Sequence, residues 1–142
     1  MLEIRPALQS ELAAIVAMLA RYFMTAAPAG EVPSEPQSPH IRINEVVAVL
    51  LDGQVVGTLQ LTFIPGLTFD GGWRAQVEGV RVRSDLRNQR IGTQLMEWVL
   101  ARARERGCRL VQLTTNAART DARRFYERLG FQASHIGMKL YL

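Results

Sequence analysis

Cysteine and histidine are scarce in this sequence. Its 142 residues include one cysteine, Cys108, and two histidines, His40 and His135. One cysteine excludes a framework of internal disulfides, and no Cys/His cluster has the spacing of a metal site. Both histidines lie in other segments than Cys108, which disfavours a nucleophilic thiol with a histidine base. We therefore expect no metal, a packed Cys108 and a surface position for His135.

Long apolar runs are missing as well. No stretch approaches the roughly 20 apolar residues of a membrane-spanning helix. The first residues, Met1 to Pro6, lack the basic and then apolar layout of a signal peptide. We therefore expect no membrane partner and a cytoplasmic location. With 48% hydrophobic residues the chain can bury a core, and its length suits one domain over residues 1–142.

Lysine is almost absent, since Lys139 stands alone against sixteen arginines. The charges are also divided unevenly. Residues 1–80 hold eight acidic residues and four arginines, whereas residues 81–128 hold five acidic residues and twelve arginines. A genomic preference for arginine explains part of this count, but not the thinning of acidic residues in the same segment. The basic second half therefore predicts an anionic partner.

Hydrophobic periodicity switches several times between strand and helix spacing. The Asp52-Gly53 pair between two β-branched runs predicts a hairpin, and Ile91, Leu95 and Val99 recur at helical spacing. The predicted elements are a strand at 2–5, a helix from Ser10 to about Phe23, strands at 45–51, 54–64 and 73–82, a helix at 91–106, a strand at 110–113, a helix at 121–129, and the last strand or strands in 131–142.

This order, β-α-β-β-β-α-β-α-β, first pairs strands as antiparallel hairpins and then adds a parallel neighbour through a β-α-β crossover. It predicts an α/β fold around a mixed sheet, of the α+β kind. A mixed sheet argues against a fully doubly wound dinucleotide-binding fold.

The segment from Val80 to Thr93 carries the chemistry, because a strand runs through a short polar loop into the start of a helix. The first N–H groups of a helix have no internal acceptor, and the helix dipole is positive there. Arg87 and Arg90 add charge at the same place, so a pyrophosphate would fit. From these residues alone, an ordinary strand, turn and helix with solvated arginines is the alternative.

Three motifs resemble those of the GNAT acetyltransferases. Arg87-Asn88-Gln89-Arg90-Ile91-Gly92 is similar to the Arg/Gln-x-x-Gly-x-Gly/Ala pyrophosphate loop of this family. Phe125-Tyr126-Glu127-Arg128-Leu129-Gly130-Phe131 is similar to its Phe-Tyr-x-x-x-Gly-Phe block, and Ile4-Arg5-Pro6-Ala7 to its first strand. The element order also matches, so the resemblance covers essentially the whole chain. It implies the GNAT acyl-CoA N-acyltransferase fold and an acetyl-CoA-dependent N-acetyltransferase.

The resemblance also implies which residues contact acetyl-CoA, with no metal taking part. Two positions depart from the family pattern. Arg90 stands where the family has its first loop glycine, and Arg119 stands where it often has an asparagine, with Asn116 nearby. The expected contacts are Val80, Arg81, Val82, Arg87, Asn88, Gln89, Arg90, Ile91, Gly92, Thr93, Asn116 and Arg119.

Tyr126 is similar to the family tyrosine that gives a proton to the departing CoA thiolate. A phenol can serve as this acid because its pKa lies above that of a thiol. The alternative for Tyr126 is an amphipathic core tyrosine on a short helix.

Glu78 lies four residues before Val82, so strand alternation places both on one face together with Val80. The resemblance implies that an acidic residue near this position acts as general base, directly or through water. It also implies that the backbone of Val80 and Val82 meets the acetyl and pantetheine groups. Glu78 could instead be a solvated glutamate, an ion-pair partner of Arg81 or Arg83, or a binder of cationic substrate.

These residues predict an enzyme that transfers an acetyl group from acetyl-CoA to a primary amine by direct attack in a ternary complex. One alternative is a catalytically degenerate domain that binds CoA as a sensor. Another is a basic nucleic-acid-binding module, which is disfavoured because aromatic residues are not interleaved with the basic ones.

The acceptor is expected to be a small-molecule or peptide amine. Loops at 26–39 and 133–137 are expected to build its site, and neither carries a readable code. The acidic first half favours an acceptor that is cationic or neutral. A homodimer also stays open.

Overall fold

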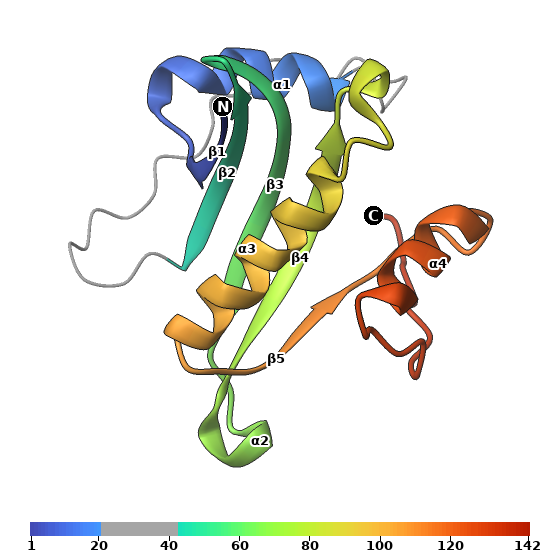
Figure 1. The fold of residues 1–142 in the computed structure, drawn as a ribbon. Helices are drawn as coiled ribbons and strands as arrows, with labels where there is room; N and C mark the ends of the chain where they lie inside the picture. Colours follow the sequence, from blue (N-terminus) through green and yellow to red (C-terminus); the bar gives the residue numbers. More distant parts are fainter. Residues whose placement is uncertain (21–42) are drawn as a thin grey trace. The chain divides into compact units, whose positions relative to one another are not determined.

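A five-stranded sheet, with its strands in the chain order β1-β2-β3-β4-β5, organises the fold (Figure 1). The computed structural model describes residues 1–20 and 43–142. Strands β1 to β4 pair antiparallel, and α3 makes the crossover from β4 to β5. The strands are β1 Leu2–Pro6, β2 Asn44–Leu51, β3 Gln54–Ile64, β4 Trp73–Val82 and β5 Cys108–Leu113; the helices are α1 Leu12–Ala20, α2 Thr68–Gly71, α3 Ile91–Glu105 and α4 Thr120–Arg128.

The predicted fold class, an α/β fold around a mixed sheet, is confirmed. The described chain forms two compact units, Met1–Gln112 and Leu113–Leu142. The first unit holds β1 to β4, α1 to α3 and most of β5, and the second holds α4.

The β2–β3 hairpin forms where the sequence predicts it. Asp52 and Gly53 both have a left-handed backbone, with φ values of 50° and 78°. Two left-handed residues in succession match the twist of a tight hairpin, which explains the Asp-Gly pair at this turn.

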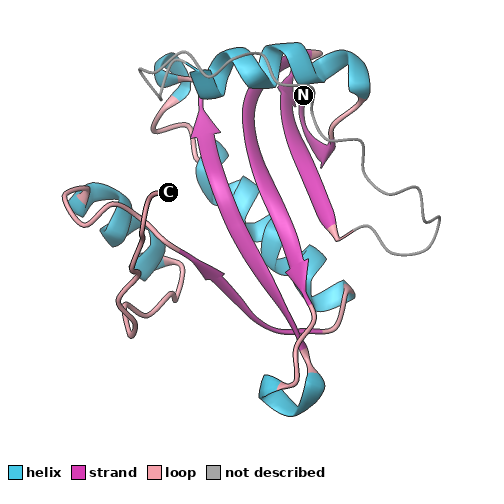
Figure 2. Cartoon of the chain, turned by 180° about the vertical axis from the view of Figure 1, so that it is seen from behind, coloured by secondary structure: helices cyan, strands magenta, loops and turns pink. Residues whose placement is uncertain are grey.

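The two faces of the sheet are covered by different helices of the first unit (Figures 1 and 2). Helix α3 lies along one face and contacts β4, while α1 contacts β3 and β4 near one end of the strands. On the α1 side, Ile15 packs in a buried cluster with Ala48 and Leu50. The fully buried core also includes Leu59, Leu61 and Phe63 of β3, Ala75 and Val77 of β4, and Leu95, Met96 and Val99 of α3.

A buried carboxylate ties the second half of α3 to the sheet. The side chain of Glu45, on β2, is only 1% exposed and accepts hydrogen bonds from Arg102 Nε, at 3.1 Å, and from Arg102 Nη2. Arg106 Nη1 lies 4.0 Å from the same carboxylate, and its guanidinium lies 4.3 Å over the ring of Phe63. Two cations against one desolvated carboxylate favour one position of this helix on the sheet, since Glu45 without them would be a buried unpaired charge.

The first helix begins later than predicted. A 3-10 turn occupies Gln9–Glu11, and α1 starts at Leu12, so Ser10 is not its N-cap. The Glu11 carboxylate accepts the Leu8 N–H instead, at 2.8 Å, and is held by Arg5, which lowers the pKa of Glu11. The predicted extension to Phe23 lies outside the described residues.

The prediction of a strand in residues 131–142 is wrong. After α4 the second unit continues without a strand, and Ile136, Met138, Leu140 and Leu142 are exposed. Their alternation has the period of a strand, but a strand also needs a hydrogen-bonded neighbour. Within the second unit as described, this segment has none.

Candidate functional site

Strand β4 has one extra residue between two of its register pairs with β3. Gln60 pairs with Glu78, and Thr58 pairs with Arg81, so two steps along β3 lie opposite three steps along β4. Gly79 lies in the extra step with a φ of +61°. This is a β-bulge, and glycine adopts its left-handed backbone without the steric penalty of a side chain.

The bulge changes which side chains share a face. Register partners point to the same side of a sheet, so Glu78 and Arg81 lie on one face, and Val82, the partner of Gly57, lies on the other. The prediction that Glu78, Val80 and Val82 share one face is therefore wrong, because simple alternation does not allow for an extra residue. Glu78 is exposed, while Val80 and Val82 are half-buried.

The loop after β4 is fixed at both ends by buried side chains. Leu86 anchors a 3-10 turn at Ser84–Leu86, and Ile91 anchors the first turn of α3. Between them, Asn88 and Arg90 both have a left-handed backbone, with φ values of 69° and 60°. The first loop glycine of the GNAT pattern is thus replaced by Arg90 at a position where the backbone still takes a glycine-like conformation.

The start of α3 is open to an anion. Arg90 is its N-cap and makes no capping hydrogen bond with its side chain, and no acidic residue lies in the first turn. The first backbone N–H groups of a helix have no acceptor within the helix, and the dipole makes this end positive. An anion with several oxygens would satisfy these donors.

The arginines of the loop differ in how they are paired. Arg83 donates to Asp85 through Nε at 2.7 Å and Nη2 at 3.0 Å, which raises the pKa of Arg83 and lowers the pKa of Asp85. Arg87 and Arg90 are exposed, and no carboxylate of the described residues forms an ion pair with them. The carboxylate in this loop is therefore already neutralised, and two arginines stay available to a ligand.

The predicted site residues of the second unit lie at the start and end of α4. Asn116 Oδ1 accepts the Ala118 N–H at 2.9 Å, so this side chain supports the turn before the helix. Arg119 is the N-cap of α4 and is half-buried. Tyr126 is half-buried, with its ring edge-on to Phe125 at 5.1 Å and to Phe131 at 5.8 Å. Glu78 and residues 80–93 therefore lie in the first unit, and the other three predicted residues lie in the second.

The structure describes two of the three remaining candidate side chains. Cys108 is half-buried, and burial raises the pKa of its thiol, which disfavours a reactive thiolate. His135 is exposed, with Nδ1 2.7 Å from Ser134 Oγ, and His40 lies outside the described residues. Within the part of the chain that the structure describes, no group of acidic, cysteine or histidine side chains could hold a metal, and no helix has the length and apolarity to cross a membrane.

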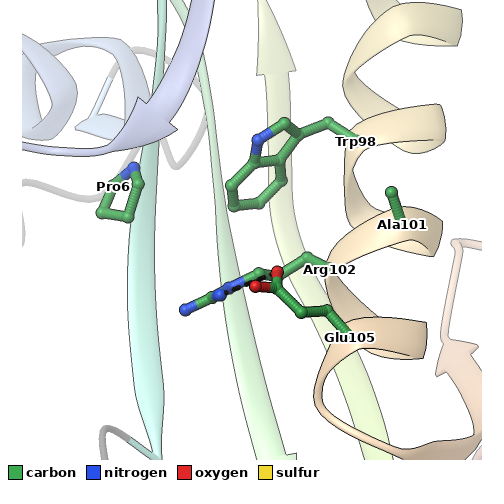
Figure 3. Close-up of a pocket in the computed structure, with 5 residues that line it drawn as sticks. All are labelled: Pro6, Trp98, Ala101, Arg102 and Glu105. Atoms are coloured by element: carbon green, nitrogen blue, oxygen red, sulfur yellow. Dashed lines mark hydrogen bonds and ion pairs between the residues drawn. The ribbon is translucent and has the colours of Figure 1, made fainter.

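A shallow pocket of about 260 Å³ lies between β1 and the second half of α3 (Figure 3). Its lining includes Pro6, Trp98 and Ala101, with Arg102 and Glu105 at one side. Arg102 donates to Glu105 through Nη1 at 3.1 Å, and its Nε and Nη2 donate to the buried carboxylate of Glu45. None of these residues is a predicted site residue, and the pocket lies at the other end of α3 from the loop.

The face of the sheet that carries Glu78 holds a set of polar side chains, of which the sequence singled out Glu78 alone. The sequence pattern could have indicated this face, since polar residues occupy every second position of β4 before the bulge. Gln112 Nε2 donates to Gln76 Oε1 at 2.6 Å, and Thr62 Oγ1 donates to Asn44 Oδ1 at 2.7 Å. The members of this polar sheet face are Asn44, Gln60, Thr62, Arg74, Gln76, Glu78 and Gln112.

Comparisons with known proteins agree on one family. The model of the acetyltransferase (GNAT) family matches residues 12–131. A crystal structure from Bacillus halodurans, described as a transcriptional regulator, is 42% identical and has a TM-score of 0.88, with 100% of each chain covered. An acetyltransferase from Trypanosoma brucei is 25% identical with a TM-score of 0.79, again over 100% of each chain.

Among curated proteins, an aminoalkylphosphonate N-acetyltransferase of Salmonella typhimurium is 38% identical over 87 residues. The match covers 61% of this chain and 56% of that protein. A second relative is matched over only 37% of its own length. The chain therefore spans about half or less of the length of the curated relatives that it matches.

The left-handed backbone at Arg90 leads to a prediction about stability. Arg90→Gly should be more stable than Arg90→Ala by about 1 kcal/mol in denaturant unfolding, because glycine adopts this backbone without the steric cost of a Cβ. Both variants lose the same charge, so the comparison isolates the backbone.

The control pair is Glu97→Gly and Glu97→Ala, at an exposed position in the middle of α3. Here the order should reverse by a similar amount, because glycine is the poorer helix former. If Arg90→Gly and Arg90→Ala unfold with equal free energies, the loop does not hold residue 90 in a left-handed conformation.

Proposed function

This chain belongs to the GNAT acetyltransferase family, and on that premise we propose that it transfers an acetyl group from acetyl-CoA to a primary amine by direct attack in a ternary complex. The observation that carries the proposal is the uncapped start of α3, which follows the bulged strand β4 after a short loop. The start of α3 would bind the pyrophosphate of acetyl-CoA, and the bulged strand near it would bind the thioester.

We assign the pyrophosphate to the loop. Its oxygens would accept from backbone N–H groups between Asn88 and Thr93, and Arg87 and Arg90 would add charge-assisted hydrogen bonds. The absence of an acidic residue in the first turn supports this assignment, as does the pairing of Asp85 with Arg83. Both features remove negative charge from the place where an anion would bind.

We assign the thioester end to the bulge. Within the described sheet, Gly79 and Val80 have no register partner on β3, since the pairing passes from Glu78 to Arg81. A backbone N–H in such a step is available to polarise a carbonyl oxygen. The backbone of Val82 would meet the pantetheine arm on the far side of the same bulge.

Two side chains are proposed to handle protons. Tyr126 would give its phenolic proton to the departing thiolate, and its ring is held by Phe125 and Phe131 within the second unit. Glu78 is exposed, so its proposed role as base would run through a water molecule. The same carboxylate would attract the cationic form of the amine before its proton is lost.

The acceptor is proposed to be a small-molecule or peptide amine. Aminoalkylphosphonates belong among the candidates, because a relative with 38% identity is named for them. A nucleic-acid ligand is less well supported, since Arg83, Arg102, Arg106 and Arg123 of the basic half are bound to carboxylates of the chain. The other alternative is a CoA sensor without turnover, and the experiment described next distinguishes it from an enzyme.

The direct test combines binding and turnover. The protein should show a higher melting temperature with acetyl-CoA, since a ligand present at 100 times its Kd stabilises the folded state by about 2.7 kcal/mol. With a panel of primary amines, including aminoalkylphosphonates, thiol release should match the amount of N-acetylated product seen by mass spectrometry.

Binding of acetyl-CoA with no product from any amine would support the sensor. No change in melting temperature at millimolar acetyl-CoA would remove the proposal altogether.

A second prediction concerns the proposed acid. Tyr126→Phe keeps the ring between its aromatic neighbours and removes only the hydroxyl, so kcat should fall by about 10²- to 10⁴-fold while the Kd of acetyl-CoA changes little. The matched control is Tyr141→Phe, because Tyr141 is 87% exposed and should lose no activity. Unchanged kcat and an unchanged pH–rate profile in Tyr126→Phe would contradict the assignment of the acid, and would leave the transferase itself standing.

A further inference from the structure

Arg74 differs from the other half-buried arginines of the first unit. Arg5, Arg102 and Arg106 each lie within 4.0 Å of a carboxylate, and Arg81 donates to the carbonyl oxygen of Val80. The Nε of Arg74 is buried, and among the described residues it has no hydrogen-bond partner. A buried N–H of a charged group without an acceptor is costly, and that cost disappears when a ligand supplies the acceptor.

The surroundings of Arg74 are suited to an oxyanion. Arg74 begins a row on β4 that continues with Gln76 and Glu78, because residues two apart share a face. Gln76 accepts from Gln112 through its Oε1, which leaves its NH₂ group as a donor. Thr62 is the register partner of Gln76, and the Thr62 hydroxyl donates to Asn44 Oδ1. The side-chain amide of Asn44 therefore also keeps its NH₂ group as a donor.

Charge is distributed along this row in a way that fits a molecule with two charges. The positive group, Arg74, and the negative group, Glu78, are four residues apart, or about 13 Å along the strand. Arg74 lies toward the β3–β4 connection, and Glu78 lies directly before the bulge. An amine held near Glu78 would therefore have its far end directed toward Arg74.

We propose that Arg74, with the amide donors of the polar sheet face, binds an oxyanion of the amine acceptor, namely a phosphate, phosphonate or carboxylate group. The acceptor is then a zwitterion whose amine and anionic group are separated by several atoms. This inference rests on the proposed function. It replaces the cationic or neutral acceptor expected from charge totals, because Glu3, Glu11, Glu45 and Asp52 are paired with cations of the chain and do not present their charge to a ligand.

The test uses pairs of acceptors that differ only in the anionic group. Each ω-aminoalkylphosphonate or ω-amino acid is compared with the alkylamine of equal length, over a series of increasing chain length. In the wild-type protein the anionic member should be the better substrate, and most strongly for the longer chains. In Arg74→Gln the ratio of kcat/KM between the anionic and the neutral acceptor should fall by about 10- to 100-fold.

Two further variants separate recognition from stability. Arg74→Lys keeps the positive charge and should retain part of the preference for the anionic acceptor. Arg104→Gln removes an exposed arginine of α3 outside the polar sheet face and should leave the ratio unchanged. Equal losses for both members of each pair in Arg74→Gln, or no loss at all, would overturn the proposal.

A binding measurement makes the test independent of turnover. Methylphosphonate is titrated into wild type, Arg74→Gln and Arg104→Gln, so that any binding at the loop contributes equally to all three. Weaker binding in Arg74→Gln alone supports the anion site even if no amine is acetylated, a result that would count only against the proposed function. Equal binding in all three proteins would overturn the Arg74 site whatever the activity.

Discussion

One extra residue in β4 determines where the candidate site residues of the first unit point. The bulge at Gly79 leaves Glu78 on the face with the polar side chains and turns Val82 to the opposite face. A Cβ on Gly79 would lie 3.6 Å from Leu19 Cδ2, which is an ordinary contact. The requirement for glycine therefore comes from the left-handed backbone, at a φ of +61°, and not from lack of space.

The bulge also divides the proposed chemistry between two parts of one strand. Residues before it belong to the polar sheet face, where the acceptor is proposed to bind. Residues after it lead through a turn anchored by Leu86 to the uncapped start of α3. The buried Glu45 with Arg102 and Arg106 holds the far half of α3 on the sheet, while the buried Leu86 and Ile91 hold the loop at its start.

Most of the architecture could be predicted from the sequence, because periodicity and turn residues act locally. The hairpin at Asp52-Gly53, strand β4 and helix α3 all lie where their patterns place them. The bulge could not be predicted from alternation, although Gly79 inside a strand is a signal for one. The ion pair of Glu45 could not be predicted from local sequence patterns either, since its partner Arg102 is 57 residues away in the chain. Arg90 was recognised as a departure from the family pattern, but only the backbone shows that it keeps the conformation of the glycine.

In the proposed complex, acetyl-CoA binds along the bulge and the loop together. The most direct measurement is a titration of the ¹⁵N-labelled protein with acetyl-CoA, followed through backbone amide chemical shifts. The largest shifts should fall at residues 79–82 and 88–93, and pantetheine, which lacks the pyrophosphate, should leave residues 88–93 unshifted. Saturating acetyl-CoA that leaves both segments unshifted, or shifts only one end of the sheet remote from them, would contradict it.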